Sequence, residues 1–229
     1  MAHAEELSKQ TKNYSYEKAQ EFARLAKENN TWLIPNLSNM DWISKQAESL
    51  ESIQNLPSLK YVHPLMKSKW LNSNRYYGAS PKLIEFYNKQ KDFHAQIVKA
   101  FKEEGVPMLA GTDAGISGIV WGFSLHDELE LLVDAGLTNE EALASATSLP
   151  AEWLEIGDKI GTIETGKFAD LILLDKNPLT DINNTRTISG MFVDGKWLDK
   201  TKIDTILEKV ANWNDANKEK FQWKNRKEL

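Results

Sequence analysis

The sequence predicts an α/β fold with parallel strands, followed by a smaller all-β segment. Helical patterns alternate with short apolar runs over residues 1–158, and this alternation is typical of parallel strands joined by right-handed crossovers. One continuous apolar run, Val106 to Ala110, is followed by a helical pattern and indicates a buried strand. From Lys159 the chain changes to short β-type runs separated by Gly and Asp, which predicts a separate β segment.

Composition limits the possible partners and metal ligands. The 229 residues carry a net charge of −5, which argues against nucleic acid or an anionic membrane as the main partner. No apolar run approaches the ~20 residues of a transmembrane helix, so we expect a soluble protein and leave its compartment open. The chain has no Cys and only four His. Any metal must therefore be held by carboxylates and by His3, His63, His94 or His126.

The first 35 residues predict the end of one element, a helix and a strand. His3 stands just before two carboxylates, Glu5 and Glu6. Apolar residues at helical spacing predict a helix that begins at Tyr16. The run from Thr31 to Pro35 is β-type and ends at a Pro, as strand termini often do.

Residues 36–80 form a long connection with two interpretations. A connection of this length often covers a site or packs as a lid, and the alternative is an irregular surface insertion. A short helix around Ile53 would be broken by Pro57. His63 precedes Pro64, which places it in extended backbone, and we assign it no ligand.

The next helix and strand lead to the candidate site. Ser80 and Pro81 predict a helix start, and Gly105 ends that helix. We expect His94, inside this helix, to be a surface or core residue that lies far from any strand end. The strand that follows delivers Asp113 into a turn of small residues. Ligands lie at this end of the strands in barrels and open α/β folds. Taken alone, Asp113 is either a functional carboxylate or an Asx turn or N-cap.

Further helices and the β segment complete the chain. Ser124 is expected to cap a helix that Gly136 ends, and Thr138 with Glu141 forms a capping box for another. Short β runs are expected from Ile160 onward, with a hairpin turn at Asp194-Gly195. Residues 200–229 predict a last helix and a Lys-rich tail that frays over 218–229.

An ordered series of motifs gives the chain a family resemblance. Gly-Thr-Asp-Ala at 111–114 is followed by the motifs His126-x-Glu128-Leu129, Ala135-Gly136-Leu137-Thr138, Ala142-Leu143, Ala146-Thr147, Gly161-Thr162-Ile163, Gly166-Lys167, Ala169-Asp170-Leu171 and Asn177-Pro178-Leu179. In this order and spacing the series resembles the carboxyl-terminal half of metal-dependent amidohydrolases, in the branch of imidazolonepropionase and Xaa-Pro dipeptidase relatives. The resemblance covers residues 90–199 and, more weakly, residues 1–35.

The resemblance implies part of a (β/α)8 barrel of the TIM type and part of a small β-sandwich. Asp113 would be the metal ligand and proton shuttle of the eighth strand, His3 the metal ligand of the sixth, and Thr31 to Pro35 the seventh strand. Residues 1–158 would then hold strands six to eight with their helices, 159–199 the sandwich segment, and 200–229 a terminal helix and tail.

The departures from the family pattern predict a fragment. The sequence has no His-x-His pair and no candidate bridging Lys, and it leaves no room for five earlier strands. We therefore expect a piece that begins inside the sixth strand, as an expressed piece, a truncated gene or a natural split subunit. Its expected partner is the missing amino-terminal half of the barrel or a second copy of itself.

The implied chemistry is hydrolysis of an amide or peptide C–N bond in a small amide or dipeptide-like substrate, with the chain inactive alone. An Asp oxygen and a His nitrogen suit Zn²⁺, whereas Mg²⁺ and Ca²⁺ prefer oxygen ligands.

His126 either reaches substrate or packs in the core, and Glu5 and Glu6 either line the site or lie in a solvated loop. Two alternatives stay open: a non-catalytic subunit or scaffold, and a different metal-dependent barrel hydrolase such as a phosphoesterase.

Overall fold

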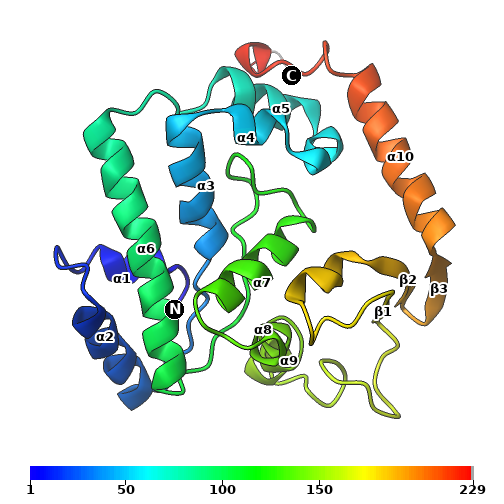
Figure 1. Cartoon of the computed structure of the whole chain (residues 1–229). Helices are drawn as coiled ribbons and strands as arrows, with labels where there is room; N and C mark the ends of the chain where they lie inside the picture. Colours follow the sequence, from blue (N-terminus) through cyan, green and yellow to red (C-terminus); the bar gives the residue numbers. More distant parts are fainter. Residues whose placement is uncertain (228–229) are drawn as a thin grey trace.

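A computed structural model describes residues 1–227 of the chain, and Figure 1 shows its elements. Three extended segments lie side by side in parallel: Ala2 pairs with Ile34, and Leu33 pairs with Met108. The His3 N–H donates to the Ile34 carbonyl at 2.8 Å, and the Leu109 N–H donates to the Leu33 carbonyl at 2.9 Å. The order and direction of these segments agree with the sequence prediction. Each pairs through isolated bridges, so they form a short parallel ladder and do not by themselves show a barrel.

Three helices pack against this ladder. They are α1 (Ala4–Ser8), α2 (Tyr16–Glu28) and α6 (Pro81–Glu103). The predicted helix starts are confirmed, because Ser15 and Ser80 accept N–H donors of the first turns and Pro81 opens α6. The apolar faces of α2 and α6 meet in the main core, which also takes in Leu33 and Met108 from the ladder.

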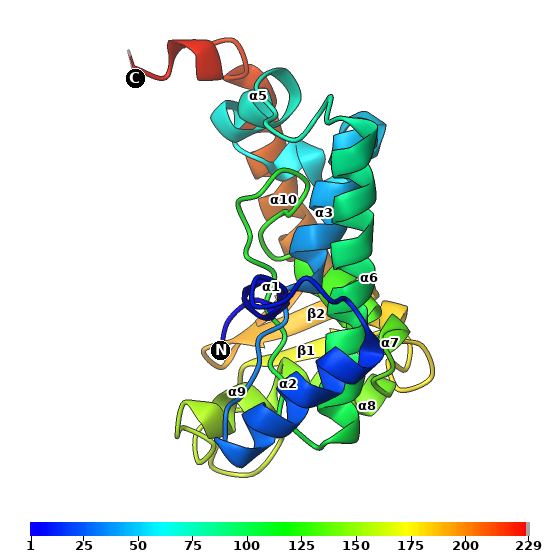
Figure 2. The ribbon, with the colours of Figure 1, turned by 90° about the vertical axis from the view of Figure 1, so that its left-hand side faces the viewer.

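The connection 36–80 is helical and has a core of its own. Its elements are α3 (Leu37–Glu48), α4 (Glu51–Gln54), the 3₁₀ turn η1 (Pro57–Tyr61) and α5 (Pro64–Asn72). Trp42, Ile53 and Trp70 are buried together with Ile119 and Val120 of the Gly-rich loop after Asp113. The interpretation as an irregular insertion is therefore wrong. Figure 2 shows α3 running beside α6, so the segment packs onto the α/β part.

Three helices follow the Gly-rich loop: α7 (Ser124–Asp134), α8 (Asn139–Ser145) and α9 (Ser148–Trp153). The capping box of α8 is confirmed, with both reciprocal bonds of Thr138 and Glu141 present. Ser124 does not cap α7 as predicted. It is the first residue of that helix, and its hydroxyl accepts the Val120 N–H at 2.8 Å, which fixes the loop instead.

The β segment is a three-stranded antiparallel sheet. Its strands are β1 (Leu171–Leu174), β2 (Ile188–Val193) and β3 (Lys196–Asp199), in the order β1-β2-β3, with the 3₁₀ turn η2 (Ile182–Arg186) between the first two. The predicted hairpin is confirmed, since Asp194 and Gly195 have the positive φ values of 50° and 70° that a tight turn needs. The β run predicted over 160–167 is wrong: these residues form turns.

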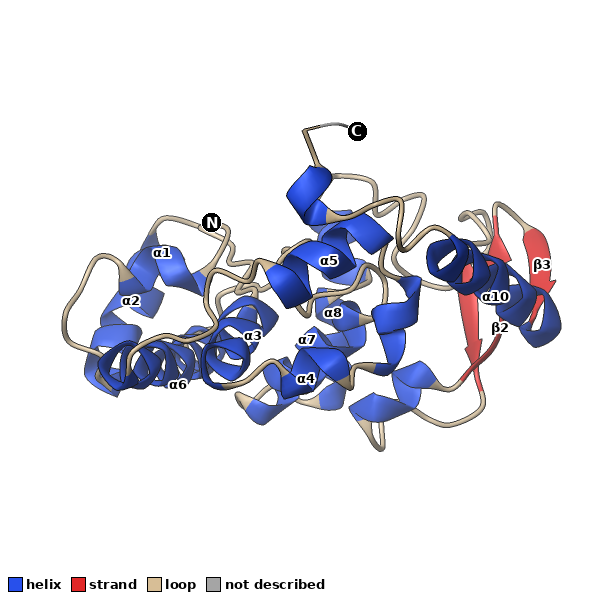
Figure 3. Cartoon of the chain, turned by 90° about the horizontal axis from the view of Figure 1, so that it is seen from above, coloured by secondary structure: helices blue, strands red, loops and turns tan. Residues whose placement is uncertain are grey.

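The carboxyl-terminal residues pack against the connection 36–80. Helix α10 (Lys200–Ala216) follows the sheet, and η3 (Trp223–Asn225) packs on α5, where the Trp223 N–H donates to the Ser68 hydroxyl at 3.1 Å. The fraying predicted over 218–229 is wrong for this anchored turn, and residues 228–229 lie outside the described part. Figure 3 shows α1, α2 and α6 at one end and the sheet with α10 at the other. No helix within residues 1–227 is both long and apolar enough to cross a membrane.

Candidate functional site

The carboxyl ends of the three parallel segments share an unusual backbone conformation. His3, Asn36 and Asp113 each follow one segment, and their φ values are 69°, 54° and 53°. A positive φ is strained for residues other than Gly, at a cost of order 1 kcal/mol or more, and such residues cluster at functional sites. The three together mark the end of the ladder where the sequence predicted the site.

A cavity of about 520 Å³ opens at this end of the ladder. His3 and Asp113, the two predicted metal ligands, both line it. Glu5 and Asn39 also contribute to its wall. The backbone is tightly packed beneath, since a Cβ on Gly111 would lie 2.5 Å from Ile34 Cγ2. The turn before Asp113 therefore needs Gly at this position.

Two Asn side chains hold Asp113 in place. The Asn39 amide Nδ2 donates to Asp113 Oδ2 at 2.9 Å. With the Asn36 amide oriented so that both its oxygen and its nitrogen have partners, its oxygen accepts the Asp113 N–H at 3.0 Å and its nitrogen donates to the Ile34 carbonyl at 2.9 Å. The strained backbone of Asp113 is thus fixed through its own N–H, and Asn39 donates to one carboxylate oxygen. Sequence reasoning missed both Asn residues.

A buried carboxylate fixes the helix that carries Asn39. Glu128 on α7 is fully buried, and its two oxygens accept the N–H groups of Leu37 and Ser38 at 2.9 and 2.7 Å. These are free donors of the first turn of α3. Burial raises the pKa of Glu128 to about 7, although both backbone hydrogen bonds oppose the rise. The sequence motif contained Glu128 but gave no sign of this capping role.

A second histidine lies beside His3. His94 on α6 is buried, its Nε2 lies 3.1 Å from the Ser8 hydroxyl, and it lines with His3 a narrow gap next to the cavity. Burial and, to a smaller extent, His3 lower the pKa of His94 to about 4. His94 is the core residue that one interpretation expected, but the expectation that it lies far from any strand end is wrong.

The other predicted residues divide between the cavity and remote positions. Glu5 and Glu6 line the cavity, and both pair with Lys9, at 3.1 and 2.6 Å. His126 on α7 contacts η2, where its Nδ1 is 2.9 Å from the Thr185 hydroxyl. Burial lowers the pKa of His126. The structure does not bring His126 to the cavity.

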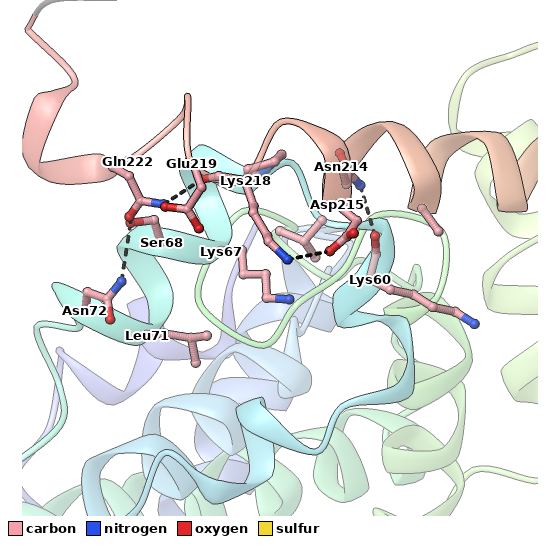
Figure 4. Close-up of a pocket in the computed structure, with 13 residues that line it drawn as sticks. Lys60, Lys67, Ser68, Leu71, Asn72, Asn214, Asp215, Lys218, Glu219 and Gln222 are labelled. Atoms are coloured by element: carbon pink, nitrogen blue, oxygen red, sulfur yellow. Dashed lines mark hydrogen bonds and ion pairs between the residues drawn. The ribbon is translucent and has the colours of Figure 1, made fainter.

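His63 is part of a separate contact. It caps α5 by accepting the Leu65 N–H, and its ring packs against Phe221 and Trp213. Near it a second cavity of about 230 Å³ lies between α5 and the end of α10 (Figure 4). This cavity is lined by mixed charges, including the Lys218–Asp215 pair at 3.0 Å, and it contains none of the predicted site residues.

The donor set is compatible with part of a metal centre. His3 offers an imidazole nitrogen and Asp113 a carboxylate oxygen, and both donor types are common in zinc sites. Within residues 1–227 no group of three His, Cys, Asp or Glu side chains is placed to hold a metal ion. Catalytic zinc sites use three protein ligands and structural sites four, so the two donors in this cavity are fewer than such a centre needs.

Comparison with known proteins decides the family. The model of the amidohydrolase family matches residues 2–198. The chain belongs to the amidohydrolase family. Members of this family are hydrolases that act on carbon–nitrogen bonds, and they generally use a divalent metal. Family membership does not favour the alternatives of a scaffold or an unrelated barrel hydrolase.

Individual amidohydrolases resemble parts of the chain. Imidazolonepropionase of Thermoplasma volcanium is 32% identical over 109 residues, which are 45% of this chain and 26% of that protein. The 5'-deoxyadenosine deaminase of Methanobrevibacter smithii is 34% identical over 108 residues, 42% of this chain and 25% of that protein. The chain thus matches about a quarter of these curated relatives.

Solved amidohydrolase structures share its α/β fold. A Xaa-Pro dipeptidase with bound methionine in its active site aligns with a TM-score of 0.56 at 26% identity, over 78% of this chain and 37% of that one. The bottromycin amidohydrolase aligns with a TM-score of 0.63 at 24% identity, over 80% of this chain and 40% of that one. The second likeness concerns the fold alone.

Proposed function

We propose that this chain supplies part of the active site of a metal-dependent amidohydrolase that cleaves the C–N bond of a small amide or dipeptide-like substrate. The observation that carries the proposal is the placement of His3 and Asp113 in one cavity at the carboxyl ends of parallel segments. The family match and the bonds that hold Asp113 support it. His3 and Asp113 are the proposed metal ligands, and Zn²⁺ is the proposed metal.

Asp113 is the proposed proton carrier. When bound, a Zn²⁺ ion lowers the pKa of water toward ~7 and polarises the substrate carbonyl. Asn39 donates one hydrogen bond to Asp113 Oδ2, and a carboxylate keeps further acceptor lone pairs on both oxygens. With these lone pairs Asp113 would hold the metal, accept a proton from the attacking water and return it to the leaving nitrogen. The Asn36 bond to the Asp113 N–H keeps this carboxylate directed to the cavity.

The remaining ligands are proposed to come from another polypeptide segment. The chain aligns with 37% of the Xaa-Pro dipeptidase structure, and two ligands are fewer than a catalytic zinc site needs. A complementary amino-terminal half of the barrel, or a second copy of the chain, would supply the rest. The isolated chain should therefore turn over small amides at close to the background rate.

Replacement of Asp113 in an intact, active parent protein tests the role of the carboxylate. Asp113→Asn keeps the shape and removes the proton acceptor, so we expect kcat to fall by ~100-fold or more. Asp158→Asn, at an exposed position away from the cavity, is the matched control and should leave kcat unchanged. Near-normal kcat in the Asp113→Asn enzyme would exclude the proposed proton transfer.

A further inference from the structure

A loop at residues 73–77, which contributes Arg75 and Tyr76 to the wall of the cavity of about 520 Å³, is held by several hydrogen bonds. Asn74 organises it: its Oδ1 accepts the N–H groups of Tyr76 and Tyr77 at 2.9 and 3.2 Å. Its Nδ2 donates to the Trp70 carbonyl at 3.0 Å and to Gln46 Oε1 at 2.8 Å. Because Gln46 on α3 is fully buried, these bonds tie the loop to the rigid helix that also carries Asn39.

Arg75 is an exposed residue of this loop at the rim of the cavity. Arg75 and Tyr76 both line the cavity that contains His3 and Asp113. The guanidinium stacks on the Tyr76 ring, 4.6 Å from its centroid, and donates a hydrogen bond to the Tyr76 hydroxyl. The Tyr76 ring in turn lies edge-on to Tyr87 of α6 at 6.2 Å. Two contacts therefore orient the guanidinium, so less freedom is lost when it binds a ligand.

Arg75 is a cation in the wall of this cavity that makes no ion pair within residues 1–227. The other cation in the wall, Lys9, pairs with Glu5 and Glu6. Arg75 makes no ion pair with any carboxylate in the part of the chain that the structure describes. A planar guanidinium presents parallel N–H donors that match the two oxygens of a carboxylate. An anionic group that enters the cavity would find its free partner here.

We propose that Arg75 is a specificity-determining residue that binds a carboxylate of the substrate. The inference rests on the proposed function, and it narrows the substrate class to amides that carry a carboxylate, such as N-acyl amino acids and dipeptides. The carboxylate pairs with Arg75 on the loop, and the amide carbon lies toward His3 and Asp113. Neutral amides of the same shape lose the ion pair and bind more weakly.

Paired ligands and variants test the inference on the full chain. N-acetylglycine carries the carboxylate, and N-acetylglycinamide is its neutral counterpart. We expect wild-type protein at low salt to bind N-acetylglycine about 10-fold more tightly in NMR titrations. Arg75→Met should reduce this ratio to near 1, and Arg75→Lys should keep a part of it, because the charge stays but the planar fork is lost.

Arg226→Met is the matched control. Arg226 also stacks on an aromatic ring, that of Trp223 at 4.8 Å, but it does not line the cavity, so its replacement should leave the ratio unchanged. Equal binding of the two ligands, no binding of N-acetylglycine, or a ratio retained in Arg75→Met would overturn the inference. The readout is binding without turnover. Carboxylate preference in this chain, together with near-normal kcat of Asp113→Asn in the intact parent protein, would therefore remove the proposed function alone. Loss of kcat in that parent variant without any carboxylate preference would remove this inference alone.

Discussion

Two buried titratable residues, Glu128 and His94, change the free energy of unfolding with pH in opposite directions. Burial raises the pKa of Glu128 to about 7, so the folded state binds its proton more tightly than the unfolded state, where the pKa is ordinary. Stability from Glu128 is therefore present at low pH and is lost as the pH rises through about 7. Burial lowers the pKa of His94 to about 4. Its contribution is present above its ordinary pKa and is lost as the pH falls toward about 4.

The pH ranges over which Glu128 and His94 affect stability overlap. Replacing one of the two residues should therefore reveal the pH dependence that comes from the other. Between pH 4.5 and 6.5, urea melts of the wild-type chain in the presence of a chelator should show little pH dependence. Glu128→Gln should give a free energy of unfolding that rises with pH, by up to ~1.4 kcal/mol per pH unit. His94→Gln should give the opposite slope. Parallel curves for both variants would mean that these groups titrate alike in the folded and unfolded states.

The Gly-rich loop packs closely against the helical connection at Gly118. A Cβ on Gly118 would lie 2.2 Å from the ring of Trp42 on α3, and its φ is 94°. Gly122 in the same loop also has a positive φ, 79°, but a Cβ added there would meet no atom of residues 1–227 within 4 Å. Gly118→Ala therefore adds a steric conflict in the core to the backbone strain that both positions share.

Comparing Gly118→Ala with Gly122→Ala separates the cost of lost packing from the cost of backbone strain. We expect Gly122→Ala to lower the free energy of unfolding by ~1 kcal/mol, because only the left-handed backbone is penalised. Gly118→Ala should cost ~2 kcal/mol more, since Trp42 has to move. Denaturant melts measure both values. Equal costs would show that the loop does not pack tightly on α3.

Local patterns predicted the elements whose causes lie close together in sequence. The α8 capping box, the Asp194-Gly195 hairpin and the start of α6 each depend on a few neighbouring residues. The parallel direction of the three segments followed from the alternation of helices and short apolar runs.

The residues that hold Asp113 and helix α3 in place could not be predicted in this way. Helix α3 is capped by Glu128, some 90 residues further along the chain, and Asp113 is held by Asn39, 74 residues before it. Asn36 and Asn39 are ordinary surface residues by type. Only the folded chain shows that they bond to Asp113. The same applies to His94, whose position beside His3 follows from the packing of α6 on α1.

At the scale of the whole molecule, the small sheet leaves apolar side chains uncovered. Ile172 and Leu173 on β1 are 58% and 56% exposed. Consecutive strand residues point to opposite faces, so both faces of this strand are open. Within residues 1–227 β1 also pairs on one side only. Open edges and exposed apolar faces favour association with another chain.

We therefore expect the isolated chain to self-associate at micromolar concentration. Sedimentation velocity should show a weight-average mass that rises with protein concentration. Replacing Ile172 and Leu173 together by Thr should weaken this association, whereas Leu25→Thr on α2, which removes a single exposed apolar residue, should not. A compact monomer with one cooperative unfolding transition would show that the chain is stable as an independent unit.

Zinc binding tests the central claim that His3 and Asp113 are two ligands of one incomplete metal centre. Competition titration against a chelating dye should show weak binding to the wild-type chain, and both His3→Gln and Asp113→Asn should weaken it by ~10-fold or more. His63→Gln is the control, because this histidine lies outside the cavity, and it should bind zinc as the wild type does. Tight stoichiometric zinc that survives Asp113→Asn would contradict the claim and place the metal elsewhere.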